Sequence, residues 1–479
     1  MKSNGTTREP RRTILIPLVI GCAFFMEGLD STMIAVAIPD MAESLGEHPL
    51  RLNLVITTYL LSLAVFIPLS GWIADRLGAR VVFCAAIAIF ATGSALCGLS
   101  TSLPMMLLMR VVQGFGGAMM TPVGRLILLR SFPRSQLFTA MTYMTLPAMV
   151  GPVIGPLLGG VITTYISWRW IFYINIPFGC VGILLALRFF EDVRHRDVPR
   201  FDFGGFLMVG AGLALLQYGI ENVGRQAIPG FAIAGALAAA GLLLLAFAWH
   251  ARRVAAPAVD LSLLRQRSFG IATLAGGLSR IGMNGVPFLL PLMLQIGFGM
   301  NPAASGSLTF CSSLGALLIR PIAVPLLRWL GFRRVLFWAS VLCSAAIAGF
   351  ALLQPETPRW VIAGYAALYG LIRSVQFMGS NTLAYADTRP ERLSRATSLG
   401  GVLQQLTVSF GVSAGATLLS LTAFEDAALT PERFHTVFLL LALIPLFALP
   451  GFLRLRPEDG REVSGHRHGR GVEESGPLP

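Results

Sequence analysis

Long apolar stretches recur along the whole chain, and they constrain its fold more than any other feature. An α-helix needs about 20 apolar residues to cross the hydrocarbon core of a bilayer. Fourteen stretches approach or exceed this length, over residues 14–38, 51–73, 80–100, 104–128, 138–163, 168–190, 204–221, 229–250, 268–295, 302–327, 334–354, 358–385, 396–423 and 433–453. Only 13% of the residues are charged, about half the usual fraction in soluble domains. The sequence therefore predicts an all-α polytopic membrane protein.

The distribution of basic residues predicts how these spans are oriented. If both tails lie in the cytoplasm, 29 basic residues fall on the cytoplasmic side and five on the opposite side. Cytoplasmic loops carry such an excess of Lys and Arg. We therefore expect a multi-pass protein of the bacterial plasma (inner) membrane with both termini cytoplasmic. The net charge of +13 does not indicate a nucleic-acid partner, because the charges lie between apolar spans instead of on one soluble face.

Two short echoes suggest a duplicated core. The segment 77–80 after the second span (LGAR) recurs as 330–333 after the tenth (LGFR), and 110–113 in the fourth span (RVVQ) recurs as 373–376 in the twelfth (RSVQ). Parallel repeats of six helices are a known plan of secondary transporters. The expected division is a cytoplasmic N-tail (1–13), an N-terminal six-helix bundle (14–190), cytoplasmic linkers with two extra helices (191–267; helices 204–221 and 229–250), a C-terminal six-helix bundle (268–454) and a disordered cytoplasmic tail (455–479).

Two acids, Glu27 and Asp30, lie inside the first span. Residues three apart occupy neighbouring positions on one helix face. A carboxylate inside a bilayer costs several kcal/mol unless it faces water, finds a partner or takes up a proton. The functional hypothesis is a proton site coupled to transport, and the alternative is an inward-facing acid that only holds a neighbouring helix. We expect Asp30→Asn to abolish coupled transport while leaving folding and insertion intact.

The segment after the second span carries a compact charged turn. It contains Gly71, Asp75, Arg76, Gly78 and Arg80. Glycine permits a tight turn where φ is positive or where backbones approach closely. We expect Asp75 to form a charge network with Arg76 and Arg80 that breaks and reforms as a gate. The alternative is a plain positively charged cytoplasmic loop.

An arginine, Arg110, lies inside the fourth span and is followed by Gln113 and a run of small residues. An arginine within a span must face protein or water. Beside an acid it would stabilise the charged form, and proton uptake by the acid would release it. The alternative is an arginine that only bonds backbone carbonyls.

The fifth span contains glycines at every fourth position together with two prolines. Such glycines allow close helix contact, and each proline removes a backbone donor and bends the helix. The sequence therefore predicts a bent, close-packed helix. The residues are Gly151, Pro152, Gly155, Pro156, Gly159 and Gly160.

These three segments resemble signatures of the major facilitator superfamily. Residues 71–80 match G-x-x-x-D-R-x-G-x-R, residues 110–118 match R-x-x-Q-G-x-G-x-A, and residues 151–160 match the antiporter signature G-x-x-x-G-P-x-x-G-G. The resemblance implies two six-helix bundles, with the first segment stabilising one gating state and Arg110 taking part in proton transfer. In the second-half copy Arg328 replaces the acid, so the first-half loop should dominate.

The fourteen spans, residues 29–32 (LDST) and residues 168–177 (WRWIFYINIP) narrow the resemblance further. They are similar to the fourteen-helix drug:proton antiporter branch (EmrB/QacA type). This resemblance implies export, two extra central helices and a link between Asp30 and proton coupling. The role of Glu27 rests mainly on the physical argument above.

Other polar residues lie inside spans, where unsatisfied amides are costly, so we expect them to face a central substrate cavity or other helices. A site for lipophilic cations alone would need an acidic cavity, and the two intramembrane arginines, Arg280 and Arg373, make this cavity less acidic. Neutral or anionic substrates therefore remain possible. The candidate cavity residues are Gln113, Arg280, Asn284, Gln295, Gln376, Asn381, Gln404 and Gln405.

The sequence thus predicts a proton-coupled antiporter that exports small, amphipathic or drug-like molecules by alternating access. A proton symporter that imports a metabolite and a non-transporting membrane sensor remain alternatives. No enzyme motif, P-loop or metal-ligand cluster is found in the sequence, so we expect no enzyme activity and no cofactor, with protons as the coupling ion. The expected partners are a small-molecule substrate and the lipid bilayer, and a periplasmic adaptor protein is left open.

Overall fold

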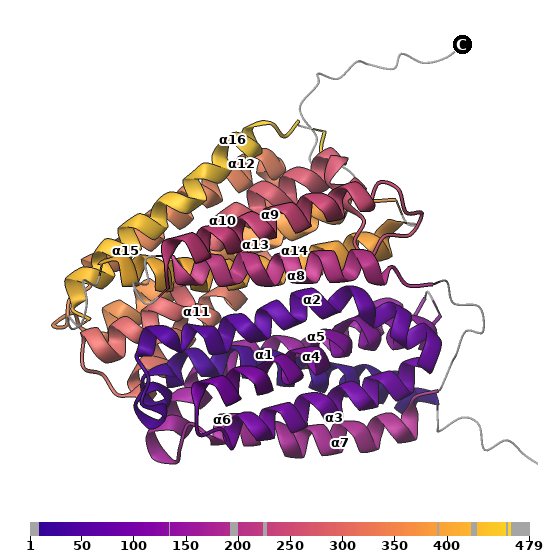
Figure 1. The fold of residues 1–479 in the computed structure, drawn as a ribbon, viewed down its shortest axis with the longest axis horizontal. Helices are drawn as coiled ribbons and strands as arrows, with labels where there is room; N and C mark the ends of the chain where they lie inside the picture. The colour runs from indigo at the N-terminus through magenta and orange to yellow at the C-terminus, as the bar shows by residue number, and fades with distance from the viewer. Residues whose placement is uncertain are drawn as a thin grey trace, which may run out of the picture.

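The computed structural model is a bundle of long, roughly parallel and antiparallel helices (Figure 1). It describes residues 9–133, 135–191, 200–223, 228–389, 392–422, 429–456 and 458–460. Within these ranges there are helices, turns and connecting segments but no β-strand. The all-α expectation is therefore confirmed.

The helices follow the chain in three groups. The first group comprises α1 (Glu9–Leu45), η1 (Pro49–Arg51), α2 (Asn53–Leu77), α3 (Ala79–Gly98), α4 (Leu103–Ser131), α5 (Leu137–Tyr165), α6 (Trp170–Tyr173) and α7 (Asn175–Phe189). The second comprises α8 (Phe203–Asn222), α9 (Gly230–His250) and η2 (Leu261–Arg265). The third comprises α10 (Arg267–Leu292), η3 (Met293–Gly297), α11 (Pro302–Leu318), α12 (Arg320–Ala348), η4 (Gly349–Leu352), α13 (Arg359–Ala386), α14 (Leu393–Thr422), α15 (Pro431–Leu443), η6 (Ile444–Ala448) and α16 (Leu449–Leu453).

Twelve helical stretches of the described residues are long and apolar enough to cross a membrane. The chain is a multi-pass membrane protein. The two expected spans outside this set, 268–295 and 302–327, correspond to α10 with η3 and to α11 with the first part of α12. Each of the fourteen expected spans therefore has a helical counterpart.

The turn after α2 and the turn inside α12 have the same backbone geometry. Gly78 between α2 and α3 has φ of 97°, and Gly331 divides α12 into two helices with φ of 73°. Glycine adopts positive φ without the steric penalty of a side chain. The two glycines are the ones that the sequence echo aligned, so the repeat is visible in the backbone.

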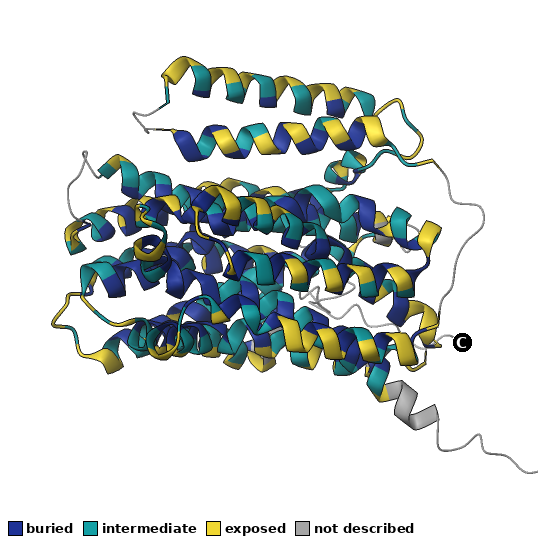
Figure 2. Ribbon diagram, turned by 60° about the horizontal axis from the view of Figure 1, so that its bottom comes forward, coloured by how far each residue is buried: buried dark blue, intermediate teal, exposed yellow. Residues whose placement is uncertain are grey.

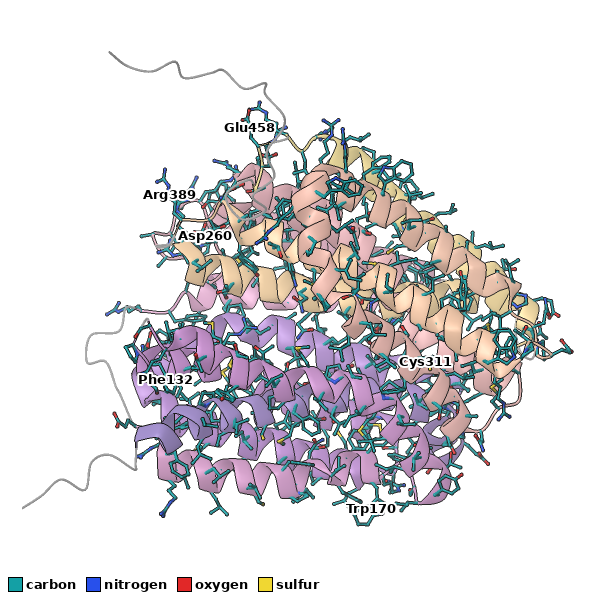
Figure 3. The ribbon with its side chains drawn as sticks, turned by 180° about the vertical axis from the view of Figure 1, so that it is seen from behind. Phe132, Trp170, Asp260, Cys311, Arg389 and Glu458 are labelled. Atoms are coloured by element: carbon teal, nitrogen blue, oxygen red, sulfur yellow. The ribbon has the colours of Figure 1, made fainter. Side chains whose placement is uncertain are left out.

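The two six-helix groups, seen from behind in Figure 3 with Phe132 labelled in the first and Cys311 in the third, pack closely where α5 crosses α11. A Cβ atom on Gly306 would meet the carbonyl oxygen of Pro156, and one on Gly160 would meet that of Pro302. The hydrogen bonds that join these two groups include three between described residues. They are Ala303 N to Thr164 Oγ1 (2.9 Å), Ser313 Oγ to the carbonyl of Pro152 (3.3 Å) and Gln295 Nε2 to the carbonyl of Val36 (2.8 Å). All three lie between the middle of the bundle and the end that is remote from the first residues of α1.

The extra helices α8 and α9 form a hairpin that stands beside the rest of the bundle (Figure 2). Helix α8 lies against both six-helix groups. Its Phe206 ring lies 6.1 Å from the ring of Phe66 on α2, and its Gln217 donates a 2.6 Å hydrogen bond to Ser413 Oγ on α14. The hairpin therefore touches both halves at the seam between them.

One carboxylate, Asp202, holds the beginning of α8 to the end of α9. It accepts hydrogen bonds from the backbone N–H of Gly205 (2.9 Å) and of Ala258 (3.2 Å), and it lies 2.8 Å from Nε2 of His250. Burial acts to raise the pKa of Asp202, but these hydrogen bonds outweigh it and lower the pKa below its usual value.

The C-terminal segment is ordered further than the sequence predicted. Leu455 is buried, the backbone N–H of Gly460 donates to Asp387 Oδ2 (3.3 Å), and Asp459 pairs with Arg267 (3.3 Å). The prediction of disorder from residue 455 is wrong for residues 455, 456 and 458–460, because one apolar and one acidic side chain attach them to α10 and α13. Residues 461–479 lie outside the described part of the chain.

Replacing Asp202 with Ala should loosen the α8–α9 hairpin. Loss of the N-cap and of the contact with His250 is expected to cost about 1–2 kcal/mol. Because the folded-state pKa is lowered, the contribution of the Asp202 carboxylate is present at neutral pH and disappears as the pH falls through that pKa. Thermal unfolding in detergent should therefore separate wild type from variant at pH 7 and bring them together in acid.

Asp202→Asn is the matched control, since it keeps an oxygen acceptor for the cap and removes the charge. An equal loss of stability for the Ala variant at acidic and neutral pH would contradict the electrostatic part of this account.

Candidate functional site

Asp30 lies at the centre of a buried polar cluster in the first half. Its side chain is fully buried, and three donors surround its carboxylate. Arg110 Nη1 donates to Oδ2 at 2.8 Å, while Gln113 Nε2 and Asn175 Nδ2 donate to Oδ1 at 2.9 and 3.2 Å. These residues bring α1, α4 and α7 together at one point. The acid predicted from the sequence is therefore paired with the arginine predicted from the sequence.

Arg110 is itself fully buried and has further partners besides Asp30. Its Nε donates to the carbonyl of Val55 at 3.0 Å, and its Nη1 donates to Gln113 Oε1 at 2.5 Å. Its guanidinium carbon lies 4.5 Å from the ring centroid of Tyr59, a cation–π arrangement. Removing one member of such a buried pair leaves an uncompensated charge, which is strongly destabilising.

Glu27 lies one turn before Asp30 on α1 but in a different environment. It is only partly buried, and its Oε2 accepts a 2.6 Å hydrogen bond from Thr121 on α4. Arg125 and Asp30 both lie close enough to interact with it electrostatically. Of the two acids, Glu27 is the more exposed, whereas Asp30 points into the six-helix group.

The charged turn after α2 has a different partner from the one expected. Asp75 pairs with Arg130 at the end of α4 (2.7 Å) and not with its sequence neighbours. Arg76 lies over the ring of Trp72, 5.2 Å from its centroid, and Arg80 donates to the carbonyl of Phe190 (3.4 Å). The expected network of Asp75 with Arg76 and Arg80 is therefore wrong in this state. Gly78 forms the turn, while a Cβ on Gly71 would meet nothing within 4 Å.

The glycine ridge of α5 packs against the part of α1 that carries both acids. A Cβ on Gly151 would meet the backbone at Phe25, one on Gly155 would meet Thr32, and one on Gly159 would meet the backbone at Met33. Pro152 in turn occupies the space beside Gly28. Despite Pro152 and Pro156, α5 continues from Leu137 to Tyr165. The glycines therefore let α5 lie directly along the acid-bearing segment of α1.

The candidate cavity residues of the second half do not form one cluster. Arg280 donates to Asn381 Oδ1 (3.1 Å) and Arg373 donates to Asn284 Oδ1 (3.3 Å), so both arginines link α10 to α13. Gln295 instead bonds to α1, and Gln113 belongs to the Asp30 cluster. Gln376 is fully buried, whereas Gln404 and Gln405 are partly buried on α14.

Two contacts of the site were missed in the sequence analysis. Asn175 binds both Asp30 and Ser94 (3.0 Å), and Thr121 binds Glu27. Asn175 stood inside the segment that carried the family resemblance, and a polar amide within a span requires a partner. This requirement could have identified Asn175 from the sequence. Thr121 could not be identified in this way, because a threonine in a helix often bonds to its own backbone.

A sequence model described as the Major Facilitator Superfamily matches residues 20–412 and 272–475. The chain belongs to this superfamily. Its curated relatives include MdtD, a protein named for multidrug resistance, from Klebsiella pneumoniae (strain 342). That relative is 38% identical over 445 residues, which cover 92% of this chain and 94% of the relative. MdtD from Escherichia coli (strain 55989 / EAEC) is 37% identical over 444 residues, again 92% of this chain and 94% of the relative.

Solved structures agree on the fold. The crystal structure of tetrameric PepTSo2 superposes with a TM-score of 0.66 at 17% identity, covering 93% of this chain and 97% of that one. A variant of the nucleoside transporter NupG gives a TM-score of 0.60 at 15% identity, covering 92% and 99%. The superfamily consists of transporters and not of enzymes, so this chain is a membrane transporter.

The Asp30–Arg110 pair should contribute strongly to stability, contrary to the expectation that Asp30→Asn leaves folding intact. We predict that Asp30→Asn and Arg110→Gln each cost about 3–5 kcal/mol, because each leaves one buried charge without its partner. The double variant should lose less than the sum of the two single variants. Thermal unfolding of the purified protein in detergent measures all three.

Asp40→Asn is the matched control, since Asp40 is a partly buried acid on the same helix. Strictly additive losses in the double variant would mean that the two side chains do not form an energetic pair.

Proposed function

We propose that the chain is a proton-driven exporter of small amphipathic or drug-like molecules. The observation that carries the proposal is the buried Asp30–Arg110 pair, with the partly exposed Glu27 one turn away on the same helix. Acids inside membrane spans are typical of proton pathways in transporters. The multidrug-resistance name of the MdtD relatives supports a drug-like substrate and outward transport.

In this proposal a proton enters through Glu27 and controls the Asp30–Arg110 pair. Proton uptake by the acids would weaken the attraction that holds Arg110, while Gln113 and Asn175 would remain as partners of a neutral Asp30. Arg110 would then shift toward the carbonyl of Val55 and the ring of Tyr59, which it already contacts. The packing of α5 on α1 would pass this change to the rest of the bundle.

We further propose that both termini lie in the cytoplasm of a bacterial cell, with the protein in the inner membrane. The arginine distribution supports this orientation. The three hydrogen bonds named above between the two halves then lie from the middle of the membrane toward the periplasmic side. Contacts that hold the halves together toward the outer side suit an exporter that takes substrate from the cytoplasm or the inner leaflet.

Import by proton symport is the main alternative, and the direction of proton movement separates the two. Adding substrate to vesicles loaded with protein should drive protons in the opposite direction to the substrate for an antiporter and in the same direction for a symporter. A sensor of the same fold would catalyse no substrate counterflow. A periplasmic adaptor protein stays an open partner.

Glu27→Gln should remove proton-driven efflux without unfolding the protein. The amide oxygen can still accept the hydrogen bond from Thr121, and a partly exposed neutral group carries no desolvation penalty for charge. In proteoliposomes we expect efflux under an imposed pH gradient to fall at least tenfold, while substrate counterflow at equal pH persists.

Glu47→Gln provides the control, because Glu47 is an acid in the connection after α1, where it pairs with Arg51. Wild-type proton-driven efflux by Glu27→Gln would remove Glu27 from the coupling mechanism and leave Asp30 as the proposed proton site.

A further inference from the structure

The two halves contain the same kind of intramembrane pair with one chemical difference. In the first half Arg110 bonds to the carboxylate of Asp30 at 2.8 Å, and in the second half Arg373 bonds to the amide oxygen of Asn284 at 3.3 Å. Asn284 follows Asp30 by 254 residues, close to the spacing of 253 between the two turn glycines of the repeat. The second half therefore keeps the arginine but replaces its acid with a neutral residue.

A second arginine without an acid lies one turn earlier on α10. Arg280 is 7% exposed, donates one hydrogen bond to Asn381 Oδ1 (3.1 Å), and has a buried Nε with no partner. The ion pairs recorded among the described residues include neither Arg280 nor Arg373. One positive charge on α10 and one on α13 are therefore hydrogen-bonded to amide oxygens, and no carboxylate is recorded against either among the described residues.

The buried amide of Gln376 adds unused hydrogen-bonding capacity at the equivalent of Gln113. Gln113 bonds through its amide to Asp30 and through its oxygen to Arg110. Gln376 is fully buried, yet neither its nitrogen nor its oxygen has a partner in the structure. Buried polar groups are normally hydrogen-bonded. Both amide atoms of Gln113 are thus bonded within the Asp30 cluster, whereas neither amide atom of its second-half equivalent, Gln376, is.

The depth of Arg280 determines what could neutralise it. It lies thirteen residues after the first residue of α10, which corresponds to about 20 Å along the helix. A lipid headgroup at the membrane surface does not reach that far. A charge inside the bilayer is costly unless it faces water or finds a partner, and an anion that enters the transporter is a partner that can reach this depth.

We propose that Arg280 and Arg373, with Asn284 and Asn381, recognise the anionic group of the transported substrate. The substrate class is an amphipathic organic anion with a carboxylate or a similar group, since an arginine guanidinium matches such groups geometrically. The ring of Phe377, 5.1 Å from the guanidinium carbon of Arg280, supplies an apolar surface beside the charge. This inference rests on the proposed export function and names its substrate.

Asn284→Asp tests the inference with a variant that should not damage the fold. It restores in the second half the acid–arginine pair that the first half already contains, and it supplies Arg373 with an internal anion. We expect carboxyfluorescein, an anionic dye, to bind the purified variant about tenfold more weakly than wild type, with binding followed by fluorescence anisotropy. Rhodamine 123, a cationic dye with the same three-ring core, should bind as well as before or better. The thermal unfolding temperature should not fall.

Arg280→Gln and Arg373→Gln should produce the same selective loss of carboxyfluorescein binding, about tenfold for one charge-assisted contact. Arg359→Gln is the matched control, because it removes an exposed arginine at the first residue of α13 and should change the affinity for neither dye. Replacing chloride in the buffer with gluconate should tighten carboxyfluorescein binding to wild type only if small inorganic anions compete for the same site.

The inference is overturned if wild type does not bind carboxyfluorescein, if Asn284→Asp leaves its affinity unchanged, or if both dyes lose affinity equally. These measurements need no proton gradient, so they are independent of the proposed coupling. Arginine-dependent binding of carboxyfluorescein without proton-driven efflux would reject the proposed function and keep the anion site. Proton-driven efflux of rhodamine 123 without carboxyfluorescein binding would do the reverse.

Discussion

The buried ion pair between Asp30 and Arg110 is the interaction on which the first half of the transporter depends. Two opposite charges inside a bilayer are tolerable only when each is fully paired, and this requirement fixes where α1, α4 and α7 meet. Close approach of helices makes the pairing possible. A Cβ on Gly93 of α3 would meet the backbone of Gln113, so the amide that supports Asp30 lies where two helices nearly touch.

The spans, the buried acid and its arginine could be predicted from the sequence, because they follow from local hydropathy and from the cost of charge in lipid. The partner of Asp75 could not be predicted from the sequence. Arg76 and Arg80 were expected because they are close to Asp75 in the sequence. In the structure Arg76 lies over the ring of Trp72, one turn earlier on α2, and Arg80 comes after the turn at Gly78. The actual partner, Arg130, comes from another helix. Such contacts depend on the register between helices, which no single stretch of sequence encodes.

The two halves have similar backbones but differ in the partners of their buried arginines. The first half pairs Arg110 with an acid, whereas Arg280 and Arg373 of the second half are hydrogen-bonded to amide oxygens. The halves are in contact along α1, since Gln295 of the second half donates a hydrogen bond to the carbonyl of Val36, six residues after Asp30. The contact of Gly306 with Pro156 links the same region through α5, which packs on α1. A change at the acids therefore has a direct physical route to the second half.

The charge of the proposed substrate limits how protons can drive its export. A proton bound near Asp30 and an anion bound near Arg280 attract each other, so simple electrostatics favours loading both at once. Exchange in opposite directions then requires that the two loaded states prefer different conformations, because a ligand shifts an equilibrium only through its differential affinity for the states. The contacts at Val36 and Pro156 join the two halves, and under the proposed function they must differ between those conformations. Under the proposed function, coupling is therefore a property of the interface between the halves and not of competition for one shared residue.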